Sequence, residues 1–259
     1  MKTTGFKKKT ERKSKILELI TEKDSISLVD LAGIMNTSLS TIRRDLDELA
    51  NAGLIKRKFG SAQMIAPPGE EMPFAWRATL NVEEKRRIAK AALDMVQNGE
   101  TIFLGGGSTV NELARLLPGQ RRVTVITNAL KVANILVDKI GIDVIVLGGS
   151  VLPEEQTIHS HLISTEIQQF HANKMFYGVQ AVSLKHGLTM SRVVEVNTDR
   201  AIAKTVDEII LLVDHSKFGK NAPMAVMPIS AVRTIITGNE LDSRVKEELK
   251  AANVNLILV

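Results

Sequence analysis

The sequence of 259 residues contains no cysteine, so disulfide bonds and metal sites with cysteine ligands are excluded. It also lacks any apolar run near the roughly 18 residues that a membrane-spanning helix needs. The first nine residues are basic and polar with no apolar stretch after them, which is not the pattern of a signal peptide. We therefore expect a cytoplasmic protein with no cofactor and no membrane partner. A chain of this length can bury a sizeable core without cross-links.

Positive charge is unevenly distributed along the chain. Residues 1–65 contain 13 Lys or Arg and 8 Asp or Glu, whereas residues 66–259 contain 21 of each. The net charge of +5 therefore belongs to the first quarter of the chain. This asymmetry is typical of a segment that binds nucleic acid or another acidic surface, although a solvated basic face with a basic tail would explain it equally well.

Three short helices are predicted in the basic segment, at residues 11–22, 28–35 and 38–52, and residues 24–27 could form a short strand. In the third helix Ile42, Leu46 and Leu49 recur at helical spacing and should face a small core. A turn cluster at 36–38 precedes this helix, and Ser38 is a suitable N-cap. Short helices with a tight turn before the last one are typical of a helix-turn-helix.

A basic hairpin is predicted directly after the third helix, which should end at Gly53. Strands at 54–58 and 62–65, joined by a turn, would add a wing to the helix-turn-helix. In such a domain the recognition helix enters the major groove, where hydroxyls bind phosphate and arginines bind phosphate or guanine edges. The predicted DNA-binding residues are Ser38, Ser40, Thr41, Arg43, Arg44, Lys56, Arg57 and Lys58.

A domain boundary is expected at residues 66–74, because three prolines and a glycine fall within eight residues. This divides the chain into a DNA-binding domain at 1–65 and a second domain at 75–259. Trp76, the only tryptophan, follows the boundary. It either anchors local packing or docks the boundary segment on the second domain or on a partner subunit.

Apolar runs alternate with helical stretches in the second domain. This alternation predicts an α/β domain with a mostly parallel sheet covered on both faces. In such sheets ligands bind beyond the carboxyl ends of the strands. The predicted strands are 101–104, 123–127, 143–147, 174–179, 208–213, 234–237 and 254–259. The predicted helices are 83–97, 109–117, 129–139, 162–170, 198–206 and 242–251.

Glycines and polar residues follow four of the predicted strands, at 105–109, 127–128, 148–150 and 214–219. The first of these loops offers a helix N-terminus and two hydroxyls, which suit a phosphate. It is not a P-loop, because no Gly-Lys-Ser/Thr follows, and Val110 occupies the third glycine of a dinucleotide fingerprint. A simple tight turn is an alternative for this loop alone, but four such loops at one sheet edge predict a binding pocket.

The run at residues 38–46, with Arg12 and Ile16 upstream, resembles the helix-turn-helix signature of DeoR-type bacterial transcription regulators. The resemblance implies that Asp45 lies beside the arginines and orients them. The wing tip departs from the family, which often has His-Gly-Gly-Ala where this chain has Phe-Gly-Ser-Ala at 59–62.

The rest of the chain resembles the same family, whose sensor domain is similar to ribose-5-phosphate isomerase. The shared features are Glu84-Lys85, Gly107-Ser108-Thr109, Thr127-Asn128, Gly148-Gly149, Gly187 with Glu195, and residues 214–217. The resemblance implies a phosphorylated sugar as effector, with its phosphate at the 105–109 loop and Lys217 assisting. The effector-binding residues so implied are Gly106, Gly107, Ser108, Thr109, Asn128, Gly148, Gly149, Glu195, Asp214 and Lys217.

Three positions depart from the family pattern. Gly105 replaces an acidic residue, so one contact to a sugar hydroxyl is expected to be missing. His159 stands where a glycine is usual, and Asp199 stands where a lysine is common. The last two are expected to alter the charge of the pocket and hence its ligand. His159 and His161 have metal-ligand spacing but no accompanying carboxylate cluster, so no metal site is expected.

These features predict a repressor of a sugar-metabolism operon that binds double-stranded operator DNA as a homodimer or homotetramer and responds to a phosphorylated sugar. We do not expect an enzyme. The alternative is a sugar-phosphate isomerase with a DNA-binding appendage, which would need a general base among Glu195, Asp199 and Asp214. A third interpretation is that the basic module binds RNA or serves as a protein adaptor.

Overall fold

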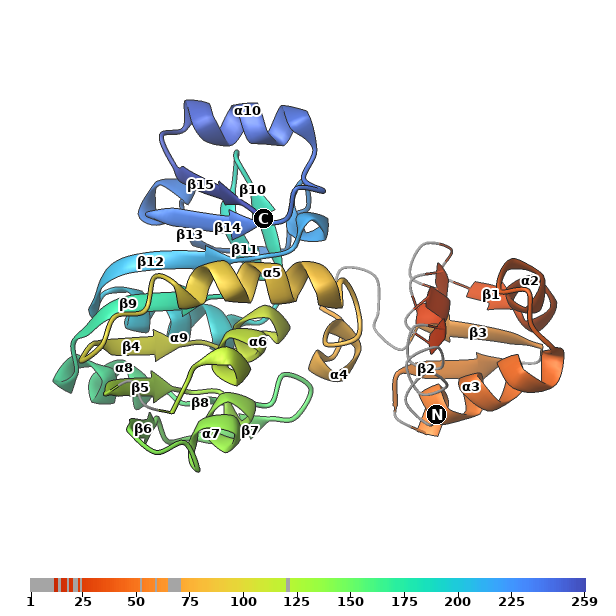
Figure 1. Ribbon diagram of the computed structural model, residues 1–259, viewed down its shortest axis with the longest axis horizontal. Coiled ribbons are helices and arrows are strands. Elements are labelled where there is room, and N and C mark those ends of the chain that lie inside the picture. The colour runs from red at the N-terminus through yellow and green to blue at the C-terminus, as the bar shows by residue number, and fades with distance from the viewer. Residues whose placement is uncertain are drawn as a thin grey trace. The chain divides into compact units, whose positions relative to one another are not determined.

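The computed structural model shown in Figure 1 describes residues 12–13, 15–17, 19–20, 23, 25–51, 53–58, 60–64, 71–119 and 122–259. The chain forms two compact units that divide between Leu80 and Asn81. Within the described part, no helix is long and apolar enough to cross a bilayer.

The first unit contains the three predicted helices wherever their residues are described. Residues 12–13, 15–17, 19–20 and 23 are helical, and a short strand and two further helices follow. Ile42, Leu46 and Leu49 are buried in one hydrophobic cluster, as their spacing predicts. The later elements are β1 (Ser25–Ser27), α2 (Leu28–Ile34) and α3 (Leu39–Asn51).

The predicted wing is also present. Strands β2 (Ile55–Lys58) and β3 (Ser61–Met64) pair antiparallel, and β1 pairs with the other edge of β3. Gly53 follows α3 with a φ of 69°, a left-handed conformation that glycine adopts without strain. The first unit is therefore a winged helix-turn-helix. Phe59 at the predicted wing tip lies outside the described residues.

A short helix, α4 (Phe74–Arg77), belongs to the first unit. Trp76 is fully buried and lies in the same hydrophobic cluster as Leu46. The tryptophan is thus a local packing anchor, and the first unit extends to Leu80 instead of ending before the expected boundary at 66–74. Most of that expected boundary segment lies outside the described residues.

The second unit is built on a seven-stranded sheet in which all neighbouring strands are parallel, in the order β15-β14-β12-β9-β4-β5-β6. All seven predicted strands are confirmed, with ends that differ by no more than two residues. The strands are β4 (Thr101–Leu104), β5 (Val123–Thr127), β6 (Ile142–Val146), β9 (Ala172–Tyr177), β12 (Val206–Leu212), β14 (Thr234–Thr237) and β15 (Asn255–Leu258).

Helices cover both faces of this sheet (Figure 1). Along β4, Ile102 and Leu104 pack in one hydrophobic cluster and Phe103 packs in the other, as expected for a strand buried on both faces. Helices α5 (Val82–Leu93), α6 (Ser108–Leu116) and α7 (Leu130–Leu136) contribute to the first cluster. Helices α8 (Ile163–Glu166), α9 (Val193–Ala203) and α10 (Ser243–Ala251) contribute to the second.

Two small antiparallel elements were not predicted from the sequence. One is the hairpin of β7 (Ser150–Leu152) and β8 (Thr157–His159), and the other is the sheet of β10 (Ala181–Ser183), β11 (Gly187–Met190) and β13 (Met224–Met227). Helix α9 begins at Val193, five residues before the predicted start at 198. The described residues of this unit also form the 3-10 turns η1 (Ile167–Gln169), η2 (His215–Lys217) and η3 (Ile229–Ala231).

Candidate functional site

The N-terminal end of α3 presents the predicted DNA-binding residues at the surface. Ser38 Oγ accepts a hydrogen bond from the Thr41 backbone N–H at 3.3 Å and lies within 3.0 Å of the hydroxyls of Ser40 and Thr41. Arg43 and Arg44 are exposed, and neither forms an ion pair with another described residue. Hydroxyl donors and two outward arginines at a helix N-terminus can bind phosphates and base edges.

Asp45 does not orient these arginines, which corrects the role that the resemblance implied. Its side chain is only 1% exposed and accepts hydrogen bonds from Arg12, with Nε at 2.5 Å and Nη2 at 3.2 Å. The bond to Asp45 raises the pKa of the Arg12 guanidinium above its ordinary value. Asp45 therefore joins the recognition helix to the first helix and leaves Arg43 and Arg44 unconstrained.

The wing carries three exposed cations on β2. Arg57 forms an ion pair with Asp47 of α3, which ties the wing to the recognition helix. Lys56 and Lys58 lie on the opposite side of the strand from Arg57, because successive side chains alternate. The side chains of these two lysines therefore point away from the Arg57–Asp47 pair.

In the second unit, the 105–109 loop joins β4 to the N-terminus of α6. Gly107 has a φ of 131°, and a Cβ built on Gly106 would lie 2.5 Å from Thr157 Cγ2. The loop backbone is thus in direct contact with β8, which a side chain would prevent. Ser108 and Thr109 are buried in the first turn of α6, where free N–H groups favour an anion.

The hairpin β7–β8 is held beside this loop by two further predicted residues. Asn128 Nδ2 donates to the Ile158 carbonyl at 3.2 Å, and the Ile158 N–H donates to the Asn128 carbonyl at 2.7 Å. Gly149 has a φ of 148°, and a Cβ there would lie 2.6 Å from the His159 carbonyl oxygen. Asn128 and Gly149 therefore position the hairpin against the end of the sheet.

Asp214 lies just beyond the carboxyl end of β12 and is almost fully buried. Its Oδ1 accepts hydrogen bonds from Asn81 Nδ2 at 3.0 Å and from the Ser216 N–H at 3.1 Å, and Lys85 Nζ lies 3.8 Å from Oδ2. Burial alone would raise the pKa of Asp214, but the charges of Lys85 and Lys217 and the bonds from Ser216 and Asn81 hold it below its ordinary value. The carboxylate is thus ionised and compensated.

Glu84, in the Glu-Lys pair that precedes the first strand of the second unit, bonds to residues that follow two other strands. Its Oε1 accepts hydrogen bonds from the His215 N–H at 2.7 Å and the Gly238 N–H at 3.1 Å, and Oε2 lies 2.7 Å from His215 Nδ1. Glu84, Asp214 and His215 are the only described residues grouped as metal ligands would be. Both Glu84 oxygens already have hydrogen-bond partners, so the group joins α5 to the ends of β12 and β14.

His159 links the hairpin to α9. Its Nε2 lies 2.8 Å from Thr157 Oγ1 and its Nδ1 lies 3.1 Å from Thr198 Oγ1, while Thr198 Oγ1 donates to the Val194 carbonyl at 2.9 Å. Because the Thr198 hydroxyl is committed as a donor, His159 donates through Nδ1 and accepts at Nε2 from Thr157. Burial, and then the charge of Arg192, lowers the pKa of His159 to about 4. The imidazole is therefore neutral.

Asp199 lies next to this chain of hydrogen bonds and is also buried. Tyr177 Oη donates to Asp199 Oδ2 at 2.6 Å. Burial raises the pKa of Asp199 to about 7, against the lowering effect of the Tyr177 bond. Tyr177 lies beside the start of the 105–109 loop, since a Cβ built on Gly105 would be in van der Waals contact with its Cδ2 at 3.6 Å. Sequence reasoning did not include Tyr177 in the site.

Family comparisons cover both units. Residues 80–239 match the DeoR C terminal sensor domain, and residues 12–67 match the DeoR-like helix-turn-helix domain. This chain belongs to the DeoR family. Its members are transcription regulators, so this DeoR-family chain is a DNA-binding regulator of transcription and not an enzyme.

Two curated relatives span nearly the whole DeoR-family chain. The HTH-type transcriptional regulator GolR of Listeria innocua is 32% identical over 94% of this chain and 96% of its own length. The glycerol-3-phosphate regulon repressor of Escherichia coli K12 is 33% identical over 89% of this chain and 91% of its own length. Ribose 5-phosphate isomerase A of Methanocaldococcus jannaschii covers 53% of this chain and 55% of its own at 20% identity, with a TM-score of 0.39, which is too distant for an argument about function.

The predicted effector residues of this DeoR-family regulator come from loops at one edge of the sheet. The loops at 105–109, 127–128, 148–149 and 214–217 follow β4, β5, β6 and β12, whose carboxyl ends meet there because the strands are parallel. Glu195 is buried in the first turn of α9. The sequence did not indicate that Thr157, Tyr177 and Thr198 lie near these loops. The one available signal was the position of Tyr177 at the end of a strand.

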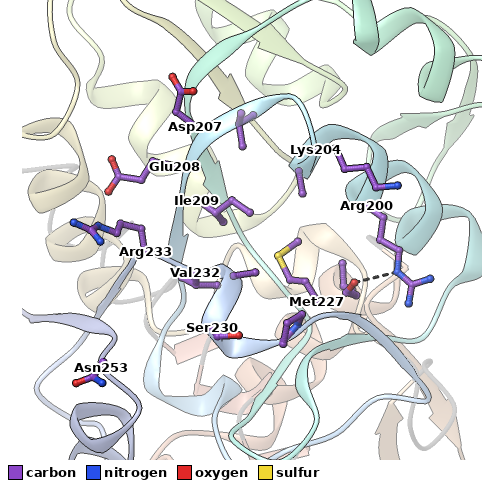
Figure 2. Close-up of a pocket in the computed structure, with 15 residues that line it drawn as sticks. Arg200, Lys204, Asp207, Glu208, Ile209, Met227, Ser230, Val232, Arg233 and Asn253 are labelled. Atoms are coloured by element: carbon purple, nitrogen blue, oxygen red, sulfur yellow. Dashed lines mark hydrogen bonds between the residues drawn. The ribbon is translucent and has the colours of Figure 1, made fainter.

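A separate cavity of about 590 Å³ lies where α9 ends and β12 begins (Figure 2). Its lining contains none of the predicted effector residues. The Arg200 guanidinium donates to the carbonyls of Val226 at 3.0 Å and Ala225 at 2.5 Å, so it holds β13 to α9. Asp207 and Glu208 also line this cavity, at the amino end of β12, away from the edge where α/β sheets bind ligands.

Proposed function

We propose that this DeoR-family regulator represses a sugar-metabolism operon and releases its operator when a phosphorylated sugar binds to the second unit. The observation that carries the proposal is the 105–109 loop, where Gly107 in a left-handed conformation places the N-terminus of α6 at the ligand edge of the sheet. The glycerol-3-phosphate regulon repressor, a relative named for a phosphorylated polyol, also favours this class of effector.

For the operator, we infer that the N-terminal end of α3 enters the major groove. Ser38, Ser40 and Thr41 would bind phosphates, and Arg43 and Arg44 would bind phosphates or guanine edges. The wing would contribute Lys56 and Lys58, with Arg57 available if its pair with Asp47 opens. Repeated half-sites require paired recognition helices, so the regulator would act as a homodimer or homotetramer, in the cytoplasm.

For the effector, we infer that the phosphate binds Gly106, Gly107, Ser108 and Thr109 at the start of α6, with Lys217 adding positive charge. Asn128, Gly148, Gly149, Glu195 and Asp214 would complete the pocket around the sugar. Release of DNA requires that the effector bind more tightly to the state with low operator affinity, a coupling of about 1–3 kcal/mol.

The proposal is tested by measuring operator affinity of the full chain with a panel of sugar phosphates and the matching unphosphorylated sugars. A sugar phosphate should raise the melting temperature and weaken operator binding by roughly 5- to 150-fold, whereas the free sugar should do neither. Ser108→Ala should reduce this response without changing operator affinity in the absence of effector. If no sugar phosphate alters stability or operator affinity, the effector half of the proposal fails.

A further inference from the structure

Two carboxyl groups in the second unit are buried to a similar extent but are compensated very differently. Asp214 is 2% exposed and has Lys85 and Lys217 beside it. Asp199 is 8% exposed, and its nearest polar partner is the uncharged hydroxyl of Tyr177. Among the described residues, no cation pairs with Asp199. A buried carboxylate without a cation is costly, so a positive charge placed beside Asp199 would stabilise its ionised form.

Asp199 is joined to the effector loop by two separate paths. Its own partner, Tyr177, lies beside Gly105 at the start of the loop, where a Cβ would be in van der Waals contact with the ring. The neighbouring residue on α9, Thr198, is joined through His159 and Thr157 to Gly106 by the hydrogen bonds described above and by direct contact. The uncompensated carboxyl group is therefore connected to the 105–109 loop through Tyr177, and its helix neighbour Thr198 is connected to the same loop through His159 and Thr157.

The charges around this pocket differ from one side to the other. Lys217 follows β12, at the same sheet edge as the 105–109 loop that follows β4 and is the proposed phosphate site. Glu195 and Asp199 lie four residues apart on α9, so they share one face of that helix, and both are buried. A ligand with a phosphate at one end and a positive charge at the other would match both sides.

We propose that Asp199 determines effector specificity by forming an ion pair with the ammonium group of a phosphorylated amino sugar. The inference rests on the proposed function, since it assigns the part of the effector that the phosphate loop does not bind. An ammonium group donates a charge-assisted hydrogen bond to the carboxylate and supplies a positive charge beside it. A hydroxyl at the same place donates a neutral bond only, and an N-acetyl group removes the charge and adds bulk.

The test compares ligands that differ at one substituent, using calorimetric titration of the full chain at pH 7.5. The probes are D-glucosamine 6-phosphate, D-glucose 6-phosphate and N-acetyl-D-glucosamine 6-phosphate, together with the three galacto counterparts. In the unmodified protein, one amino sugar phosphate should bind at least about tenfold more tightly than its hydroxyl and N-acetyl analogues. This comparison requires no variant.

Two matched variants then assign the preference to Asp199. Asp199→Asn keeps the shape of the side chain and removes its charge, and should reduce the preference to less than about threefold. Asp207→Asn makes the same change at an exposed residue at the start of β12, where Asp207 pairs with His171, and should leave the preference intact.

The outcomes separate this inference from the proposed function. Equal affinity for the amino and hydroxyl sugar phosphates, or a preference that survives in Asp199→Asn, overturns the assignment of Asp199 but leaves the phosphorylated sugar as effector. Tighter binding of the N-acetyl analogue overturns it in the same way. If none of the six sugar phosphates binds while another sugar phosphate of the wider panel does, the assignment of Asp199 fails and the proposed function stands.

Discussion

The buried ion pair between Arg12 and Asp45 gives a quantitative prediction for the DNA-binding unit. Asp45→Asn keeps the size of the side chain, so it opens no cavity, but it removes the charge and one of the two acceptor oxygens that Arg12 uses. A hydrogen bond to a charged group contributes about 1.5–3 kcal/mol to stability. The Arg12 side chain is 24% exposed and can regain some hydration, so we expect a loss of about 2 kcal/mol, in the lower part of that range.

The same helix carries the control. Asp47 also pairs with an arginine, Arg57, but the two side chains are 48% and 36% exposed. Exposed pairs contribute less than about 1 kcal/mol, because water solvates both charges before and after the pair breaks. Asp47→Asn should therefore change the stability of the first unit by about 0.5 kcal/mol or less. The two variants differ in burial and not in chemistry.

The chain provides its own probe for this measurement. Trp76 is the only tryptophan and is buried with the core of the first unit, so its fluorescence should follow unfolding of that unit during a urea titration. Asp45→Asn should lower the midpoint without changing the slope of the transition. A stability of Asp45→Asn within about 0.5 kcal/mol of the unmodified protein, or equal to that of Asp47→Asn, would refute the reasoning. Operator affinity of the folded Asp45→Asn variant should not fall, because Asp45 does not touch Arg43 or Arg44.

Three further predictions concern single residues. Arg44→Ala should weaken operator binding by about 1–3 kcal/mol if the arginine reads a base, measured by fluorescence anisotropy over a salt series; unchanged affinity at every salt concentration would remove Arg44 from the interface. Gly149→Ala should lower the stability of the second unit by about 1–3 kcal/mol in thermal melts, because a Cβ would lie 2.6 Å from the His159 carbonyl oxygen. A melting curve identical to that of the unmodified protein would contradict this contact. Burial raises the pKa of Asp199 to about 7, so the folded protein retains a proton that the unfolded chain releases from about pH 4 upward. The free energy of unfolding, relative to that of Asp199→Asn, should therefore fall by as much as about 4 kcal/mol as the pH rises from 4 to 7. A difference between the two proteins that does not vary with pH would exclude the raised pKa.

The sheet of the second unit could be predicted from the sequence because each strand carries a short apolar stretch, and these stretches alternate with helical ones. In β4, Ile102, Phe103 and Leu104 enter the two hydrophobic clusters alternately, so the strand is buried on both faces. Helix α9 was predicted less well. It begins with Val193 and Val194, which are exposed and β-branched, so the local pattern did not indicate a helix there.

The binding residues could be predicted only in part, for a reason that concerns contact partners. Gly107 and Ser108 follow a strand directly, so their place at the sheet edge follows from topology alone. The partner of Asp45 is 33 residues away, and the bond of Tyr177 to Asp199 spans 22 residues. Spacing along the chain carries no information about such pairs. This is why the role of Asp45 was wrongly assigned and Tyr177 was missed.

The contact between Gly106 and Thr157 has a consequence for how a bound ligand would be felt elsewhere in the second unit. No space separates the loop from β8, and Thr157 is bonded onward to His159 and Thr198. A displacement of the loop toward β8 would therefore meet Thr157, which is hydrogen-bonded through His159 to Thr198 in the second turn of α9. One continuous chain of contacts therefore connects the 105–109 loop to α9. The loop leads into α6 on one face of the sheet, and α9 packs on the other face.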